Sequence, residues 1–211
     1  MKVAIVIGVD RVSSGLPTLR AAASGAREVG IWLQRNGYRV EVFADDTGPV
    51  TRSDIFRAIL AHVEAANVKR LVVYFAGHGF LKGPLDEFWL LSGSLVDPAE
   101  AVNVSLSSRF ARYHSIPEIV FISDACRVTP KTAVNASIIG ASIFPNIQTS
   151  AGSAEIDLYF ATRPGDPAHE RKATEAKRAH GLFTQVLLDA HKDAPAEAIL
   201  AFDGREYVSN I

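Results

Sequence analysis

Two segments decide the fold of this chain: Leu71–Gly79 (LVVYFAGHG) and Glu118–Arg127 (EIVFISDACR). Each begins as an apolar, β-branched run and stops at reactive residues, His78 in the first and Cys126 in the second. Continuous apolar runs of this length are typical of strands buried on both faces of a parallel sheet. Residues just past the carboxyl ends of adjacent parallel strands meet at one sheet edge, where open α/β sheets place their ligand sites. We therefore expect His78 and Cys126 to meet there if the two segments are neighbours.

Cys126 is the only cysteine in the chain, and its reactivity depends on a neighbouring base or cation. A free thiol has a pKa of about 8.5, so only a few per cent is thiolate at neutral pH. A histidine within hydrogen-bond reach supplies a base and, once protonated, a stabilising charge. The sequence therefore predicts a dyad of Cys126 and His78. The alternative is an inert, buried cysteine, the commoner role of a lone Cys, but the polar residues around Cys126 favour a nucleophile.

The composition indicates a single globular domain covering residues 1–211. The chain is 48% apolar and carries a formal net charge of −1. This balance provides no basic surface for nucleic acid or an anionic membrane, and no apolar run approaches the roughly 20 residues of a membrane-spanning helix. A lone cysteine excludes an internal disulfide framework and suits a reducing cytosol, so we predict a cytoplasmic protein. No Cys/His cluster has metal-ligand spacing, and the residues themselves require no metal or cofactor.

Strand and helix patterns alternate along the chain. Besides the two quoted segments, the predicted strands are Val3–Gly8, Tyr38–Ala44, Phe88–Ser92 and Asp157–Thr162, the last of them another buried strand. The predicted helices are Leu19–Leu33, Ile55–Ala66 after a capping pattern at Thr51 and Asp54, Leu106–Tyr113 and Phe183–Ala190. Such alternation favours an α/β sandwich with a mostly parallel central sheet.

The order of these parts resembles the caspase-like cysteine peptidases, in particular the metacaspase-type and bacterial branches. The matching pieces are Tyr74–Gly79 (YFAGHG), Ser123–Arg127 (SDACR), Tyr159–Gly165 (YFATRPG) and Gly181–Leu188 (GLFTQVLL). An Ala-Cys nucleophile with its histidine about 50 residues upstream is a known caspase signature. The resemblance implies a caspase-haemoglobinase-like three-layer sandwich. It also implies a large-subunit-like part (1–126), a linker (127–156) and a small-subunit-like part (157–211) that in the family is usually followed by more chain.

The resemblance assigns the chemistry to a few positions. Cys126 would be the nucleophile that attacks a peptide carbonyl, and His78 would protonate the leaving amine. The backbone N–H groups of Gly79 and Cys126 would hold the oxyanion, and donors of this kind typically lower the barrier by ~3–4 kcal/mol. No side chain stands out as a third group that orients His78, which leaves a backbone carbonyl for that role.

The resemblance also predicts cleavage after Arg or Lys. Asp124 stands where metacaspases carry an Asp of an acidic S1 pocket, and a buried carboxylate there would pair with a basic side chain. The family's second pocket Asp aligns with Gly25 here, which is a departure from the pattern. Glu170 lies near the position at which Asp-cleaving caspases carry an arginine, and so disfavours an acidic P1. Asp10 is a further substrate-binding candidate on the same sheet edge, with a solvated loop as its alternative.

The predicted function is therefore that of a cysteine endopeptidase in regulated proteolysis, such as bacterial stress, cell-death or defence signalling. Its partners would be a polypeptide substrate and a regulatory protein or further domain. Metacaspase-type relatives often need calcium, so calcium is a candidate activator, although the sequence contains no readable calcium loop. Two alternatives remain: a catalytically silent caspase-like scaffold that binds a partner protein, and a flavodoxin-like binding domain in which Cys126 is incidental.

Overall fold

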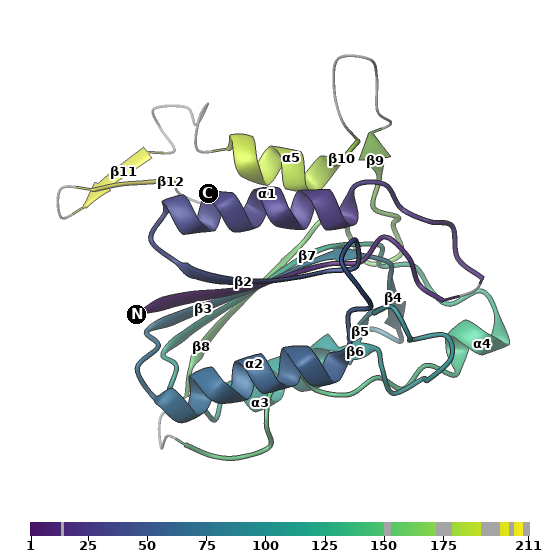
Figure 1. Ribbon diagram of the computed structural model, residues 1–211, viewed down its shortest axis with the longest axis horizontal. Helices are drawn as coiled ribbons and strands as arrows, with labels where there is room; N and C mark the ends of the chain where they lie inside the picture. Colours follow the sequence, from purple (N-terminus) through teal and green to yellow (C-terminus); the bar gives the residue numbers. More distant parts are fainter. Residues whose placement is uncertain (14, 150–152, 172–178, 191–198, 203–204, 209–211) are drawn as a thin grey trace.

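A five-stranded parallel sheet forms the centre of the protein in the computed structural model (Figure 1). The strand order is β2-β1-β3-β7-β8, and the strands are β1 (Lys2–Gly8), β2 (Arg39–Ala44), β3 (Arg70–Gly77), β7 (Glu118–Ala125) and β8 (Glu155–Phe160). The structure describes all residues except 14, 150–152, 172–178, 191–198, 203–204 and 209–211. Every neighbouring pair in this sheet is parallel, so the predicted sheet type is confirmed.

Helices cover both faces of the sheet and complete a three-layer sandwich, as Figure 1 shows. α1 (Ala22–Arg35) and α5 (Leu182–Asp189) lie on one face, and α2 (Arg52–Ala65) and α3 (Val104–Ala111) lie on the other. α2 begins where the capping pattern predicts, because Thr51 Oγ1 accepts a hydrogen bond from the Asp54 N–H at 3.2 Å. In the described part of the chain, no helix is long and apolar enough to cross a membrane.

Smaller elements surround this sandwich. Directly after β3 the chain forms a three-stranded antiparallel sheet with the order β4-β5-β6. The smaller elements are β4 (Gly79–Lys82), β5 (Asp86–Trp89), β6 (Val102–Asn103), α4 (Ala133–Ala136), β9 (Glu170–Arg171), β10 (His180–Gly181), β11 (Ile199–Phe202) and β12 (Arg205–Val208). Of these elements, only β5 corresponds to a predicted strand. It begins two residues before the start of the predicted strand Phe88–Ser92 and ends three residues before its end.

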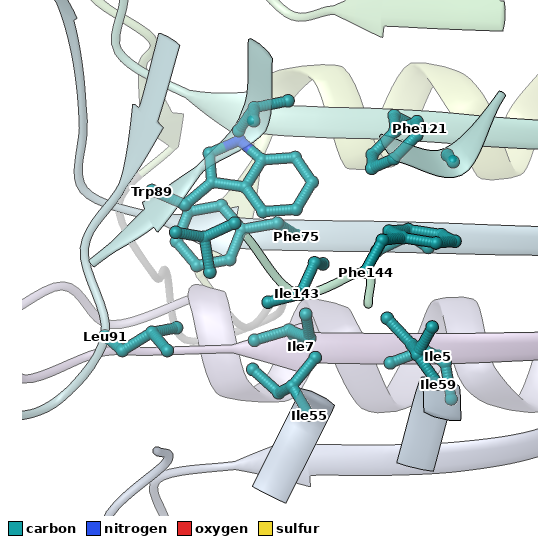
Figure 2. Close-up of a cluster of buried hydrophobic side chains, with 14 of the residues drawn as sticks. Ile5, Ile7, Ile55, Ile59, Phe75, Trp89, Leu91, Phe121, Ile143 and Phe144 are labelled. Atoms are coloured by element: carbon teal, nitrogen blue, oxygen red, sulfur yellow. The ribbon is translucent and has the colours of Figure 1, made fainter. Parts of the chain in front are cut away.

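The larger hydrophobic core lies between the sheet and the layer of α2 and α3 (Figure 2). Trp89 is its largest fully buried side chain. Its ring stacks on Phe75 with 4.9 Å between centroids, and its indole N–H donates a hydrogen bond to Ser123 Oγ at 2.9 Å. Buried aromatic rings contribute a large apolar area with a defined geometry. Trp89 therefore fixes the β4–β5 hairpin to both β3 and β7.

The register of β3 and β7 places the two reactive residues next to each other. Gly77 at the end of β3 pairs with Ala125 at the end of β7. His78 and Cys126 are the next residues along these neighbouring strands. The two quoted segments are therefore sheet neighbours, which was the condition for His78 and Cys126 to meet.

One expectation about the C-terminal half is wrong in part. β8 begins two residues earlier than predicted and is an edge strand of the five-stranded sheet, with Leu158 and Tyr159 43% and 41% exposed. An apolar run alone does not distinguish an edge strand from a central one. The segment that the resemblance identifies as a linker (127–156) contains α4 and buries Ile143 and Phe144 in the larger core (Figure 2).

The contact between Gly8 and α1 is a testable constraint on the fold. A Cβ atom at Gly8 would lie 2.6 Å from the Ala22 carbonyl oxygen and 2.7 Å from Ala26 Cβ. Overpacking of this kind typically costs about 1–3 kcal/mol, so Gly8→Val should lower the free energy of unfolding measured by urea denaturation. Gly93→Ala is the matched control, because a Cβ there meets Glu100 Cγ at an ordinary 3.6 Å. Equal losses in both variants would contradict the close approach of α1 to β1.

Candidate active site

A narrow pocket opens at the carboxyl edge of β3 and β7 and has a volume of about 70 Å³. His78 and Cys126 both line it, together with Asp124. Further lining comes from the loop before α1, from residues 168–170 and from Gly181. The structure therefore gathers residues from five separate stretches of chain around the thiol and the imidazole.

The imidazole of His78 is oriented by a backbone carbonyl. His78 Nε2 lies 2.7 Å from the carbonyl oxygen of Pro17. Because a carbonyl oxygen can only accept, Nε2 carries the hydrogen and donates it. Nδ1 makes no hydrogen bond within the described part of the chain, so it is available to exchange a proton with a bound molecule. The sequence indicated a carbonyl for this role but gave no sign that it belongs to Pro17.

Asp10 orders the loop that carries Pro17. Its Oδ1 accepts hydrogen bonds from the N–H groups of Ala22 at 2.8 Å and Ala23 at 3.2 Å, while its carbonyl accepts from the Leu19 N–H. The carboxylate thus caps the first turn of α1 from outside the helix. Burial raises the pKa of Asp10, and the two N–H donors partly offset that effect. Asp10 does not line the pocket, so the structure gives its predicted contact with substrate no support.

The thiol of Cys126 contacts the 166–170 segment rather than His78. Sγ accepts a hydrogen bond from the Ala168 N–H at 3.3 Å and lies 3.7 Å from the Ala168 carbonyl oxygen. Within the described residues, it makes no hydrogen bond to the imidazole. Burial raises the pKa of Cys126; the Ala168 N–H opposes this effect and the negative charge of Asp124 adds to it. The thiol of the free protein is therefore held largely in its protonated form at neutral pH.

The N–H of Gly79 is left outside the β4–β5 ladder. Leu90 N donates to the His78 carbonyl at 2.9 Å, and Gly79 is paired with Trp89. In an antiparallel ladder this makes Gly79 and Trp89 a non-hydrogen-bonded pair. The Gly79 N–H is thus free of the hairpin that carries it.

Glycine is required at position 79 by the close approach of the nucleophile's strand. A Cβ atom there would lie 2.9 Å from both Ala125 Cβ and the Cys126 carbonyl oxygen. The Gly79 N–H is therefore an uncommitted backbone donor beside the nucleophile's strand, and an oxyanion needs donors of this kind.

Asp124 links the pocket to helix α5. Its Oδ2 accepts hydrogen bonds from the Thr184 N–H at 3.2 Å and from the Thr184 hydroxyl, and Thr184 Oγ1 lies 2.5 Å from the Tyr74 hydroxyl. Gly181, the residue at the N-cap of α5, has no side chain to cap the helix, and a Cβ there would collide with Asp124 Oδ2. Asp124 therefore performs the capping role that Gly181 leaves open.

The other oxygen of Asp124 remains uncommitted. Oδ1 makes no hydrogen bond to the described residues, and the side chain lines the pocket. Burial raises the pKa of Asp124, opposed by the bonds from Thr184 and reinforced by the negative charge of Glu170. Glu170 lines the same pocket and accepts hydrogen bonds from the backbone N–H groups of Arg20 and Ala21. No Lys or Arg occurs among the described residues that line this pocket, so its field is negative.

The described residues provide no evident metal centre. No group of three or more His, Cys, Asp or Glu side chains is placed to hold an ion, within the part of the chain that the structure describes. The acidic residues near the pocket accept hydrogen bonds from backbone N–H groups instead, at the starts of α1 and α5. This arrangement does not fit a preformed calcium site, for which six to eight oxygen ligands are typical.

A thiol and an imidazole thus lie at neighbouring strand ends of a parallel α/β sandwich. The family model described as a caspase domain matches residues 1–201, and the chain belongs to this family of cysteine peptidases. A search of curated proteins finds no significant match.

Two solved structures share the fold. Caspase-1 from Spodoptera frugiperda superimposes with a TM-score of 0.63 at 15% identity, covering 94% of this chain and 73% of that one. A protein from Geobacter sulfurreducens gives a TM-score of 0.60 at 15% identity, covering 91% of this chain and 82% of that one. At this identity the likeness shows the fold alone.

The raised pKa of Cys126 gives a direct chemical prediction. Iodoacetamide reacts with the thiolate, so its rate of reaction with the native protein should rise with pH through a midpoint above that of free cysteine. Asp124→Asn removes a nearby negative charge and should move this midpoint to lower pH. The urea-denatured protein is the control, with the midpoint of an ordinary thiol. A native midpoint at or below the denatured one would contradict the burial of the thiol.

Proposed function

We propose that the protein is a cysteine endopeptidase that cuts polypeptides after Arg or Lys. The observation that carries this proposal is the pocket beside Cys126, which is lined by the carboxylates of Asp124 and Glu170 and by no described Lys or Arg. An arginine or lysine side chain entering it would gain charge-assisted hydrogen bonds. An acidic side chain would instead be desolvated next to two carboxylates, which is strongly unfavourable.

Asp124 is suited to be the principal P1 contact. Its Oδ2 is held by Thr184, so the carboxylate is fixed before substrate arrives, while Oδ1 has no partner among the described residues. A fixed carboxylate with one free oxygen loses little freedom when a cation binds, and preorganisation of this kind favours affinity. Glu170, at the start of β9, adds a second negative charge to the lining of the pocket.

The geometry supports a two-stage acyl transfer. When substrate fills the pocket, the thiol proton passes to Nδ1 of His78 and the thiolate of Cys126 attacks the scissile carbonyl. The N–H groups of Gly79 and Cys126 stabilise the oxyanion. The tetrahedral intermediate collapses as Nδ1 returns the proton to the leaving amine. Water then gives a proton to His78 and attacks the thioester, which releases the acid product and restores the thiol.

The cellular setting is proposed on the family resemblance. We place the enzyme in the cytoplasm, because its lone cysteine suits a reducing compartment, and in regulated proteolysis such as bacterial stress, cell-death or defence signalling. A protonated resting thiol suits a peptidase that stays silent until substrate, a regulatory protein or an ion such as calcium changes the site. Neither nucleic acid nor a membrane is a proposed partner.

A catalytically silent scaffold is the second candidate function. This alternative is favoured by the contacts of Cys126 Sγ, which is hydrogen-bonded to the backbone of Ala168 and not to His78. In such a protein the domain would bind a partner without cutting it. The uncommitted Gly79 N–H beside the thiol favours catalysis over this alternative.

A matched set of fluorogenic peptides tests the proposal. Substrates that differ only in P1 (Arg, Lys, Asp, and citrulline as the neutral isostere of Arg) are compared with and without calcium. The wild type should prefer Arg or Lys, and Cys126→Ala should show no turnover. Hydrogen bonds to charged groups contribute about 1.5–3 kcal/mol, so Asp124→Asn should reduce the preference for Arg over citrulline by about tenfold or more.

The controls test the nucleophile and the P1 preference of the pocket separately. Melting temperatures establish that Asp124→Asn still folds, since Asn retains one oxygen acceptor for Thr184. Faster turnover of the Asp peptide than of the Arg peptide would refute the acidic pocket. Turnover that survives in Cys126→Ala would refute the nucleophile.

A further inference from the structure

Arg127, the residue after the nucleophile, joins three parts of the structure through its side chain. Its Nε donates to Glu87 Oε2 at 2.8 Å, and its Nη1 donates to the Thr162 carbonyl at 3.3 Å. The guanidinium carbon lies 4.0 Å from the centroid of the Phe160 ring. One side chain therefore connects the nucleophile loop to strand β5 and to the end of β8.

The backbone of Arg127 makes a second connection to the same region. Its N–H donates to the Asp166 carbonyl at 3.1 Å, and its carbonyl accepts from the Gly165 N–H at 2.9 Å. Two residues beyond Asp166, the Ala168 N–H donates to Cys126 Sγ. The segment that contacts the thiol is thus fixed, through Arg127, to the residue that follows the thiol.

Glu87 connects this arrangement to the other side of the pocket. It lies on β5, in the hairpin whose first residue, Gly79, carries the uncommitted N–H beside the thiol. Glu87 is only 2% exposed, and its Oε1 has no hydrogen-bond partner among the described residues. A buried ion pair is weak evidence for stability, and an unsatisfied oxygen within it calls for an explanation other than stability.

We propose that Arg127 is a positioning residue for the reaction, with Glu87 as its anchor. The pair holds the Gly79 hairpin, Cys126 and the 162–170 segment in one fixed arrangement, so that the oxyanion donors, the nucleophile and the P1 pocket keep their mutual distances. This inference rests on the proposed peptidase function. Arg127 does not itself line the pocket and acts through the residues it fixes.

Three variants separate positioning from simple stability. Arg127→Gln leaves the Glu87 carboxylate buried without a counter-charge, so its melting temperature should fall. Glu87→Gln alone keeps a hydrogen-bond acceptor for Arg127. The double variant Glu87→Gln/Arg127→Gln removes both charges and should recover most of the lost melting temperature, but it cannot restore the contacts with Thr162 and Phe160. Arg109→Gln is the control, because Arg109 is an exposed arginine on α3.

Two readouts are taken on each variant: kcat and KM for the Arg peptide, and hydrogen exchange of residues 162–170. If Arg127 is a positioning residue, the double variant should melt near the wild type, yet show a kcat at least tenfold lower and clearly faster exchange in this segment. Recovery of kcat together with melting temperature, or unchanged exchange, would overturn the inference. If the double variant does not fold, Arg127→Lys replaces it, because Lys keeps the charge but cannot form the same planar fork.

The same readouts distinguish this inference from the proposed function. Absence of turnover in the wild type as well as in all variants would refute the peptidase function. It would leave the Arg127–Glu87 pair testable, because hydrogen exchange of residues 162–170 still reports whether that pair fixes the segment. Wild-type turnover together with a fully active double variant would support the peptidase function and refute the positioning role of Arg127.

Discussion

The parallel register of β3 and β7 is the constraint on which the site depends. Because Gly77 is opposite Ala125, the strands end together and present His78 and Cys126 at the same edge. A slip of one strand by one residue would turn all of its side chains to the opposite face of the sheet. The register is secured by the core below it, where Trp89 stacks on the β3 residue Phe75 and donates to the β7 residue Ser123 (Figure 2). The same packing fixes the hairpin that supplies Gly79.

The charges of the pocket connect binding with reactivity. Asp124 adds to the burial that keeps the Cys126 thiol protonated, and the same carboxylate is the proposed partner of a basic P1 side chain. When a cation pairs with Asp124, the carboxylate raises the pKa of the Cys126 thiol less, because the positive and negative charges offset each other at Sγ. A substrate with the correct P1 residue would therefore favour the thiolate that attacks it. An enzyme built in this way has a poorly reactive thiol in the absence of substrate.

The sequence was sufficient for the central sheet and for the reactive residues, because these depend on local runs. Apolar segments that end at His78 and Cys126 predicted the strands and the edge at which the two residues lie, but their adjacency came only from the structure. The contacts of the site were not predictable, because they join residues far apart in the chain: Pro17 with His78, Ala168 with Cys126, Thr184 with Asp124. The exposure of β8 was missed because the burial of a strand depends on its position in the sheet.

Covalent labelling by a mechanism-based probe is the sharpest test of Cys126 as the nucleophile beside an acidic P1 pocket. Two peptidyl acyloxymethyl ketones that differ only in P1, one with Arg and one with Asp, are incubated with the native protein, and the labelled residue is located by tandem mass spectrometry. We expect the Arg probe to label Cys126, to do so faster than the Asp probe, and to be blocked by excess Arg peptide. Faster labelling by the Asp probe, or reaction of the Arg probe at residues other than Cys126, would contradict this expectation.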